Sequence, residues 1–96
     1  MQDKGISVVG VSWYRLEQYL QLRAMYVDGD TLPATYQEWL TEARKVYDVL
    51  LAEGFRLEKV LIDPVEFPAW CRRKGLPMNG PTRSRYVQEI TATKPG

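Results

Sequence analysis

The stretch TYQEWLTEARKVYDVLLAEG, residues 35–54, carries the strongest structural signal in the chain. Thr35 and Glu38 form a capping-box pattern at its start, and Gly54 fits the position just after a helix end. Apolar residues between them recur at i, i+3, i+4 and i+7, which on an α-helix covers an arc of about 140°. We therefore expect one long amphipathic helix whose apolar side faces inward; its apolar residues are Tyr36, Trp39, Leu40, Ala43, Val46, Tyr47, Leu50 and Leu51. Arg44 and Asp48 on the other side are spaced for an i, i+4 ion pair.

A strand-like segment lies on each side of this helix. Residues 6–12, ISVVGVS, are rich in β-branched residues, and Gly10 marks a bulge or a close approach of another segment. Residues 55–62, FRLEKVLI, alternate at first and then become continuously apolar. This pattern predicts a strand that is increasingly buried towards its end.

Three further helices are expected. Residues 14–27 place Leu16, Tyr19, Leu20, Ala24 and Val27 at helical spacing, which predicts an amphipathic helix. A second helix begins at residues 63–66, DPVE, with an aspartate cap, and ends at Gly75 and Leu76 in a Schellman motif. Pro68 makes its first turn irregular. Residues 82–90 predict the last helix, although residues 86–93 also have strand character.

The fold class that follows is α/β (α+β), in the order β-α-α-β-α-α, with a small sheet covered by helices. The length of 96 residues fits a single domain spanning 1–96, with an ordered core at about 6–91 and frayed ends. Two strands alone make a sheet of marginal stability, and the unpaired backbone groups of an uncovered edge can hydrogen-bond to a strand of another chain. We therefore expect a homodimer or another protein partner.

The composition excludes much chemistry. There is no histidine and only one cysteine, Cys71, so serine or cysteine triads and the usual zinc sites are excluded. The acidic residues lack the spacing of a calcium loop, and Asp28, Asp30 and Asp63 are typical of turns and caps. We expect no metal, no cofactor and no catalytic residue. Cys71 is expected to be an inert core thiol; the alternative is a nucleophile activated by the arginines that follow it.

The expected location is the cytoplasm. The N-terminus lacks the basic start and apolar run of a signal peptide, and a single cysteine forms no internal disulfide. No apolar run approaches the roughly 20 residues needed to cross a bilayer. We expect no contact with a membrane.

Charge is unevenly distributed along the chain. Residues 1–68 hold 7 Lys/Arg and 11 Asp/Glu, net −4, whereas residues 69–96 hold 6 Lys/Arg and 1 Glu, net +5. A turn between two helices could gather the cations beside a helix N-terminus, which is a common way to bind phosphate or nucleic acid. The candidate anion-binding residues are Arg72, Arg73, Lys74, Thr82, Arg83 and Arg85. The alternative is that these cations complement a helix dipole and the acidic remainder of the chain.

Aromatic residues are the other candidates. Trp39 lies on the regular apolar stripe and is expected in the core. Trp13, Tyr14 and Trp70 could instead line a ligand pocket or a partner interface, where large side chains with a polar tip are favoured. For Trp13 and Tyr14, at the junction of a strand and a helix, core and site are equally open interpretations.

The combined pattern resembles a group of short uncharacterised bacterial proteins. The resemblance rests on Trp13-Tyr14 before a helix, residues 32–40 (LPATYQEWL), Gly54, residues 62–64 (IDP), Phe67 and residues 70–76 (WCRRKGL). It covers about residues 12–90, implies a bacterial origin and supplies no mechanism. Our functional expectation is a non-enzymatic interaction or accessory module, and the alternative is a domain that binds a small anion, a nucleotide or nucleic acid.

Overall fold

The computed structural model describes residues 8–92. The elements are, in order, β1 (Val8–Trp13), η2 (Leu16–Gln18), α1 (Tyr19–Met25), η3 (Gly29–Thr31), α2 (Tyr36–Ala52), β2 (Arg56–Leu61), α3 (Glu66–Lys74) and α4 (Gly80–Ala92), where η marks a 3-10 turn. This order confirms the expected α+β class with two strands and four α-helices. Residues 6–7 of the first expected strand, and the expected frayed ends, lie outside the described residues.

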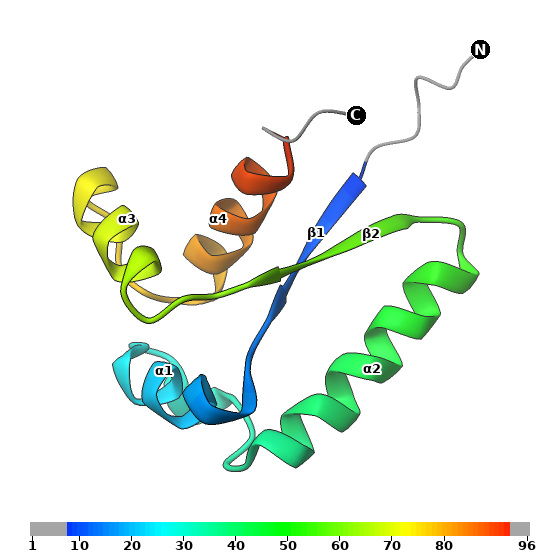
Figure 1. Cartoon of the computed structure of the whole chain (residues 1–96), viewed down its shortest axis with the longest axis horizontal. Coiled ribbons are helices and arrows are strands. Elements are labelled where there is room, and N and C mark those ends of the chain that lie inside the picture. Colours follow the sequence, from blue (N-terminus) through cyan, green and yellow to red (C-terminus); the bar gives the residue numbers. More distant parts are fainter. Residues whose placement is uncertain (1–7, 93–96) are drawn as a thin grey trace.

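The two strands form a parallel sheet. Their register runs from Val8 opposite Arg56 to Trp13 opposite Leu61. Parallel strands need a long crossover, which α1 and α2 provide. Figure 1 shows α2 alone on one side of the sheet, α3 and α4 on the other, and α1 beyond the end of β1. The molecule is therefore layered, with a very narrow sheet at its centre.

The ends of α2 confirm the caps expected from sequence. Thr35 Oγ1 accepts a hydrogen bond from the Glu38 N–H at 3.2 Å. At the other end Gly54 adopts a φ of +96°, and the Phe55 N–H donates to the Leu50 carbonyl at 3.1 Å. These are the bonds of a Schellman motif, whose left-handed residue is strained for any side chain.

The apolar stripe of α2 is less buried than expected. Of its eight apolar residues only Trp39 is buried, while Val46 and Leu51 are 57% and 47% exposed. The expectation that all eight face inward was wrong because two strands are too narrow to cover so wide an arc. The Arg44–Asp48 ion pair does not form either; within the described chain α2 carries instead a pair between Lys45 and Glu42 at 3.8 Å.

The helix after β1 also differs from expectation. A single helix over 14–27 is replaced by a 3-10 turn and a seven-residue α1. Leu16, Leu20 and Val27 are 62%, 60% and 71% exposed, whereas Tyr19 and Leu22 are buried. Tyr19 faces inward as expected, and its hydroxyl donates to the Pro33 carbonyl at 2.6 Å. Leu22 is buried in place of the three exposed apolar residues, so the buried side of the helix lies further around its axis than the spacing predicts.

The start and end of α3 agree with the sequence pattern. Asp63 Oδ2 accepts hydrogen bonds from the N–H groups of Val65 and Glu66, both at 2.8 Å. Pro68 is the third residue of α3, where an N–H has no partner within the helix, so its ring is tolerated. At the end of α3 the Leu76 N–H donates to the Cys71 carbonyl at 3.0 Å.

Residues 86–92 are helical, which resolves the ambiguity between helix and strand. Tyr86 and Val87 of α4 are buried. The helix approaches β1 so closely that a Cβ on Gly10 would lie 2.7 Å from the Val87 carbonyl oxygen. Gly10 is therefore a close-approach glycine, one of the two roles expected from the sequence.

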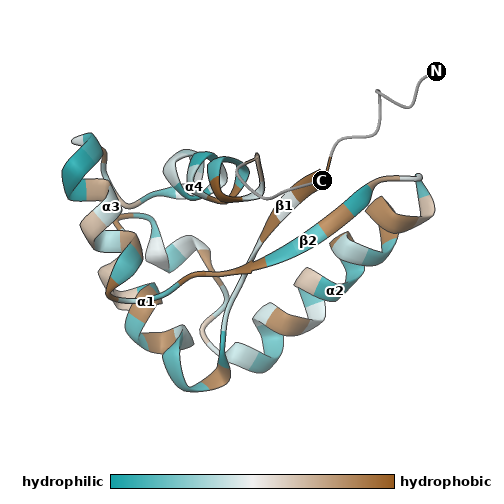
Figure 2. Ribbon diagram, turned by 45° about the horizontal axis from the view of Figure 1, so that its top comes forward, coloured by the Kyte–Doolittle hydropathy of each residue, from teal (hydrophilic) through white to brown (hydrophobic). Residues whose placement is uncertain are grey.

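The core is largely aromatic. Trp13, Tyr14, Tyr19 and Trp39 pack edge-on or tilted at the end of β1, with Trp13 and Trp39 ring centroids 5.2 Å apart. Phe67, Trp70 and Tyr86 form a second group between α3 and α4. Figure 2 shows hydrophobic residues along β1 and towards the end of β2, and mixed character along the helices.

Candidate functional site

The N-terminus of α4, where the sequence predicts an anion, holds a carboxylate of the chain itself. Asp28 Oδ2 accepts a hydrogen bond from the Gly80 N–H at 2.9 Å. Arg83 donates to both oxygens of Asp28, with Nη1 to Oδ1 at 2.9 Å and Nη2 to Oδ2 at 3.3 Å. The next free amide, Thr82 N–H, donates to Asn79 Oδ1 at 3.1 Å. This helix end is therefore satisfied internally.

Two tyrosines complete this buried polar network. The Arg83 guanidinium lies 4.3 Å from the centre of the Tyr26 ring, and the Tyr26 hydroxyl donates to the Tyr14 hydroxyl at 3.2 Å. The hydrogen bond from Arg83 holds the pKa of Asp28 below its ordinary value. Burial raises the pKa of Tyr14 and of Tyr26, so both phenols are neutral. The cluster is one ion pair among neutral groups, and it ties the segment after α1 to α4.

The remaining cations of the predicted anion set point outward. Arg72, Arg73 and Lys74 are exposed in the last turn of α3, where positive charge complements the helix dipole. Lys74 Nζ and Arg85 Nε share Glu89, at 3.9 and 3.2 Å. Anion binding by these four residues stays a prediction, but Thr82 and Arg83 are buried and engaged within the fold.

Cys71 is one of the residues that line a surface pocket beside the end of α3. The pocket has a volume of about 300 Å³ and is lined by Pro68, Cys71, Arg72, Gly75, Leu76, Pro77 and Met78. The Cys71 side chain is buried, and this burial raises the pKa of the thiol. A protonated thiol is a poor nucleophile, so this environment favours the inert interpretation. Among residues 8–92, no three Cys, Asp or Glu side chains lie close enough to hold a metal ion.

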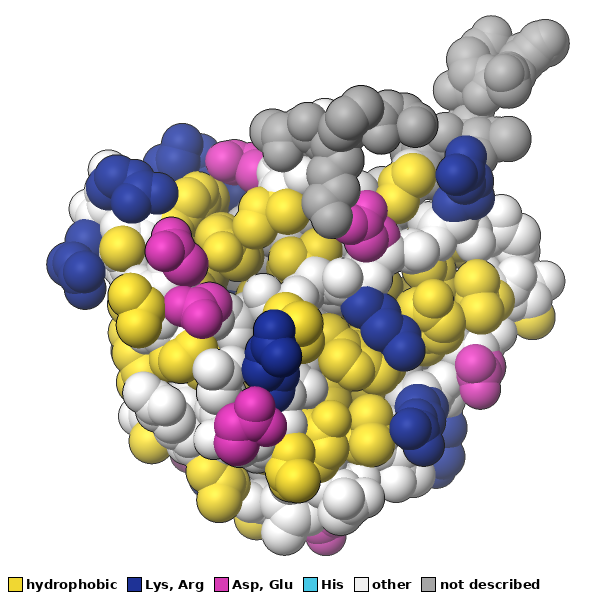
Figure 3. Space-filling model, viewed as in Figure 1, with side chains coloured by type: hydrophobic (Ala, Val, Ile, Leu, Met, Phe, Trp, Pro, Cys, Tyr) yellow, Lys and Arg dark blue, Asp and Glu magenta, His cyan; other side chains and the backbone are white. Residues whose placement is uncertain are grey.

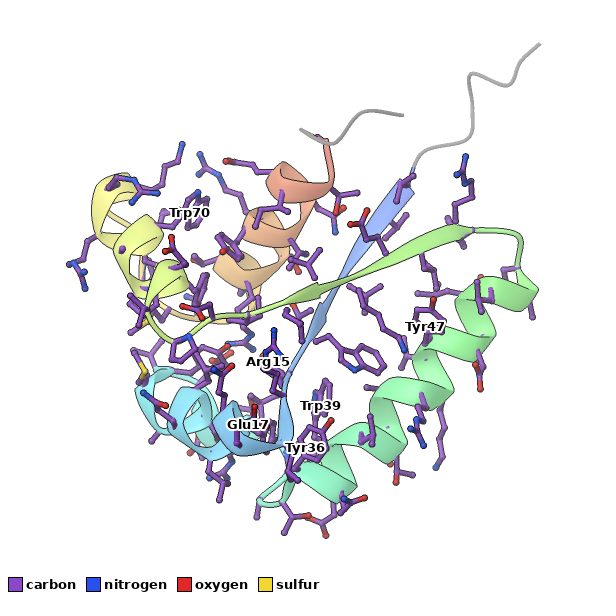
Figure 4. All side chains as sticks on the ribbon, viewed as in Figure 1. Arg15, Glu17, Tyr36, Trp39, Tyr47 and Trp70 are labelled. Carbon is purple, nitrogen blue, oxygen red and sulfur yellow. The ribbon has the colours of Figure 1, made fainter. Side chains whose placement is uncertain are left out.

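The three aromatic candidates for a pocket or interface lie in the core. Trp13 and Trp70 are each 8% exposed and Tyr14 is 3% exposed. Figure 4 shows Trp70 between α3 and α4 and Trp39 between β1 and α2. Their large rings fill the space that so narrow a sheet leaves between helices, so the structure assigns them a packing role.

The two edges of the sheet differ in the hydrogen-bond partners of their outward backbone groups. On β1, Gly10 directs both backbone groups away from β2, and the Gln88 side chain pairs with them: Gly10 N–H to Oε1 at 3.1 Å and Nε2 to the Gly10 carbonyl at 2.9 Å. At Gly10 a primary amide thus takes the hydrogen-bonding place of a neighbouring strand, and α4 lies close against β1 at this point. On β2, Ile62 N–H donates to the Trp13 carbonyl, so alternation turns the backbone groups of Leu57, Lys59 and Leu61 to the outer edge. Within residues 8–92, no side chain forms hydrogen bonds with the outward backbone groups of β2 in the way that Gln88 does with Gly10 of β1.

An apolar surface borders the open edge of β2. We call it the α2–β2 surface and define it by Leu40, Tyr47 and Leu51 of α2 with Lys59 and Leu61 of β2. Lys59 Nζ lies 4.3 Å from the centre of the Trp13 ring and 5.0 Å from that of Tyr47, while Leu51 and Leu61 are 47% and 43% exposed. Figure 3 shows hydrophobic side chains spread over β2 and α2 with basic side chains among them.

These features define a small α+β domain whose most distinctive surface is an unpaired strand edge beside an incompletely covered helix. No protein-family model, curated protein or solved structure matches the chain. The resemblance to short bacterial proteins therefore stays a prediction. No helix within the described chain is long and apolar enough to span a membrane.

Sequence reasoning missed the partners that close the fold. The local pattern assigns Asp28 to a turn and gives Gln88 no role beyond the surface of a helix. Their partners Arg83 and Gly10 lie 55 and 78 positions away along the chain. Pairs at such separations leave no local pattern, and a turn aspartate or a helix-surface glutamine looks ordinary in sequence.

Proposed function

We propose that this chain is a non-enzymatic interaction module that acts by self-association, with the open edge of β2 as its binding surface. The observation that carries the proposal is the difference between the two edges. Gln88 pairs with Gly10 on the β1 edge, where α4 approaches closely, whereas Leu57, Lys59 and Leu61 present unpaired backbone groups on β2. A row of such groups is a template for another strand.

A second copy is the partner that fits this edge. Pairing β2 with β2 of another chain extends a marginal two-stranded sheet to four strands, the range in which sheets are independently stable. It also covers apolar side chains that the narrow sheet leaves exposed, among them Leu51 and Leu61. Closed two-fold dimers are the commonest soluble assemblies.

The test uses a substitution that blocks pairing of β2 with a strand of another chain. The N–H of Lys59 faces the open edge, so Lys59→Pro removes a donor that the monomer does not use, and proline is tolerated on edge strands. The matched control is Lys59→Thr, which also loses the contacts with Trp13 and Tyr47 but keeps the N–H and favours a strand.

Sedimentation equilibrium from low micromolar to about 100 µM, a range in which mass action separates monomer from dimer, gives the readout. We expect a dimer for the natural chain and for Lys59→Thr, and a monomer for Lys59→Pro with a retained helical circular dichroism spectrum. A natural chain that stays monomeric over the whole range would overturn the proposal. So would a Lys59→Pro variant that is folded and still dimeric.

A further inference from the structure

We infer that the two α2 helices of such a dimer pack antiparallel across its two-fold axis, with Arg44 of each copy paired to Asp48 of the other. This inference rests on the proposed function and deepens it by specifying the second contact of the interface. It begins from symmetry. Two identical β2 edges can pair in one sheet only as antiparallel strands related by a two-fold axis perpendicular to that sheet. Because α2 lies on one face of the sheet (Figure 1), both α2 helices of the dimer then lie on the same face of the four-stranded sheet.

A second contact is needed on grounds of size. A stable interface buries about 1,200–2,000 Å² in total. An edge strand of six residues is only about 20 Å long and supplies part of that area. The surface beside it on α2 is apolar: Leu40, Tyr47 and Leu51 follow each other at spacings of seven and four residues and so share one side of the helix. In Figure 3 this part of the molecule is rich in hydrophobic side chains.

The register of the strands places the axis. Pairing Lys59 with itself across the axis would oppose like charges, which destabilises a strand pair. A shift by one residue puts Val60 on the axis and Lys59 opposite Leu61 of the other copy, and it keeps outward backbone groups facing each other. Because the Lys59 ammonium lies 5.0 Å from the Tyr47 ring, this axis passes α2 near Tyr47.

Charges on α2 are complementary about that point. An antiparallel helix pair centred near residue 46 sets Arg44 opposite Asp48 of the other copy, twice by symmetry. Both residues are exposed, and neither forms a salt bridge within the described chain, although their spacing would allow one. Arg44 lies on the same side of the helix as Leu40 and Leu51, at spacings of four and seven residues. The surface is therefore self-complementary in its charge pattern, and its apolar residues can pack against their copies.

The experiment is a charge swap read as a dimer dissociation constant by sedimentation equilibrium. Arg44→Glu alone and Asp48→Arg alone each replace two attractions by two repulsions, and we expect each to weaken the dimer about tenfold, as 1.4 kcal/mol corresponds to a factor of ten. The double variant Arg44→Glu with Asp48→Arg restores the attraction in reverse, and we expect it to return to within about twofold of the natural chain.

Lys45→Glu is the matched control, since Lys45 lies about 100° around the helix from Arg44 and carries a similar exposed charge. It should leave the dissociation constant unchanged. A dimer that Lys59→Pro disrupts but neither single charge variant weakens would overturn the helix contact and leave the strand pairing intact. A double variant as weak as the singles would also overturn it. A chain that never dimerises would refute both this inference and the proposed function.

Discussion

Replacing Asp28 by asparagine should destabilise the fold more than any other single surface-accessible carboxylate change. The substitution keeps the size of the side chain but removes its charge. Arg83, whose side chain is only 10% exposed, would then keep a buried positive charge without a counter-ion. The Gly80 N–H at the start of α4 would also face a weaker acceptor.

The magnitude follows from the bonds that are lost. Hydrogen bonds to charged groups contribute about 1.5–3 kcal/mol each, and breaking a fully buried ion pair costs about 3–5 kcal/mol. The Asp28 side chain is 29% exposed, so water replaces part of the loss and the low end applies. We expect Asp28→Asn to lower the free energy of unfolding by about 2–3 kcal/mol, which for a domain of this size lowers Tm by about 10–20 °C.

The assay is urea and thermal unfolding followed by circular dichroism, in parallel with Asp30→Asn as the control. Asp30 is exposed two positions away, and its removal should change stability by less than about 0.5 kcal/mol. Comparable effects of the two substitutions would refute the reasoning, because the Arg83 contact would then contribute nothing that an exposed turn carboxylate does not.

The same pair predicts a pH dependence with a definite sign. The hydrogen bond from Arg83 holds the pKa of Asp28 below its ordinary value, so the unfolded chain takes up this proton first as the pH falls. The contribution is therefore complete above about pH 4, the ordinary range of a carboxyl group, and is lost as the pH drops towards the folded-state pKa. The stability difference between the natural chain and Asp28→Asn should shrink below about pH 4. A difference that grows in acid would contradict the assignment.

Two further predictions concern packing. Gly10→Ala should destabilise the fold by about 1–3 kcal/mol, because its Cβ would press on the Val87 carbonyl at 2.7 Å, whereas Gly80→Ala, with no contact closer than 3.4 Å, should cost less in the same urea unfolding assay. Cys71 should react with a soluble disulfide reagent far more slowly in the native state than in urea, because burial both shields it and raises the pKa of its thiol. Equal loss in the two glycine variants, or rapid native labelling, would disprove the respective point.

Local rules predicted the elements of this fold well. Thr35, Gly54, Asp63 and Gly75 each cap or terminate a helix where the sequence pattern indicated. These features depend on hydrogen bonds within a few residues, so the sequence contains all the information that they need. Their positions in turn limited the strands to two short segments and gave the correct order of elements.

Contacts between distant segments were not predictable in the same way. The seven-residue α1 carries apolar residues around most of its circumference, so they define no single face, and packing of Tyr19 and Leu22 decides which side turns inward. Arg83 looked like one of several free cations because its partner, Asp28, lies far away in the sequence. A basic cluster in sequence therefore overstates the outward charge of this region, since one of its members, Arg83, is buried and paired with the half-buried carboxylate of Asp28.

The mismatch on α2 is the feature from which the association follows. Residues 36–51 carry an apolar arc of about 140°, as the i, i+3, i+4, i+7 pattern implies, yet two strands cover only part of it. Exposed apolar residues scattered singly need no explanation, but Leu51 and Leu61 flank a strand edge whose backbone groups are also unpaired. Two further strands and a second α2 helix from another copy would pair the free backbone groups and cover the exposed apolar residues together. A partner that paired with the strand edge alone would leave the apolar side of α2 exposed, and a partner that covered α2 alone would leave the strand edge unpaired. A second copy related by a two-fold axis covers both surfaces, so it fits better than either of these partners.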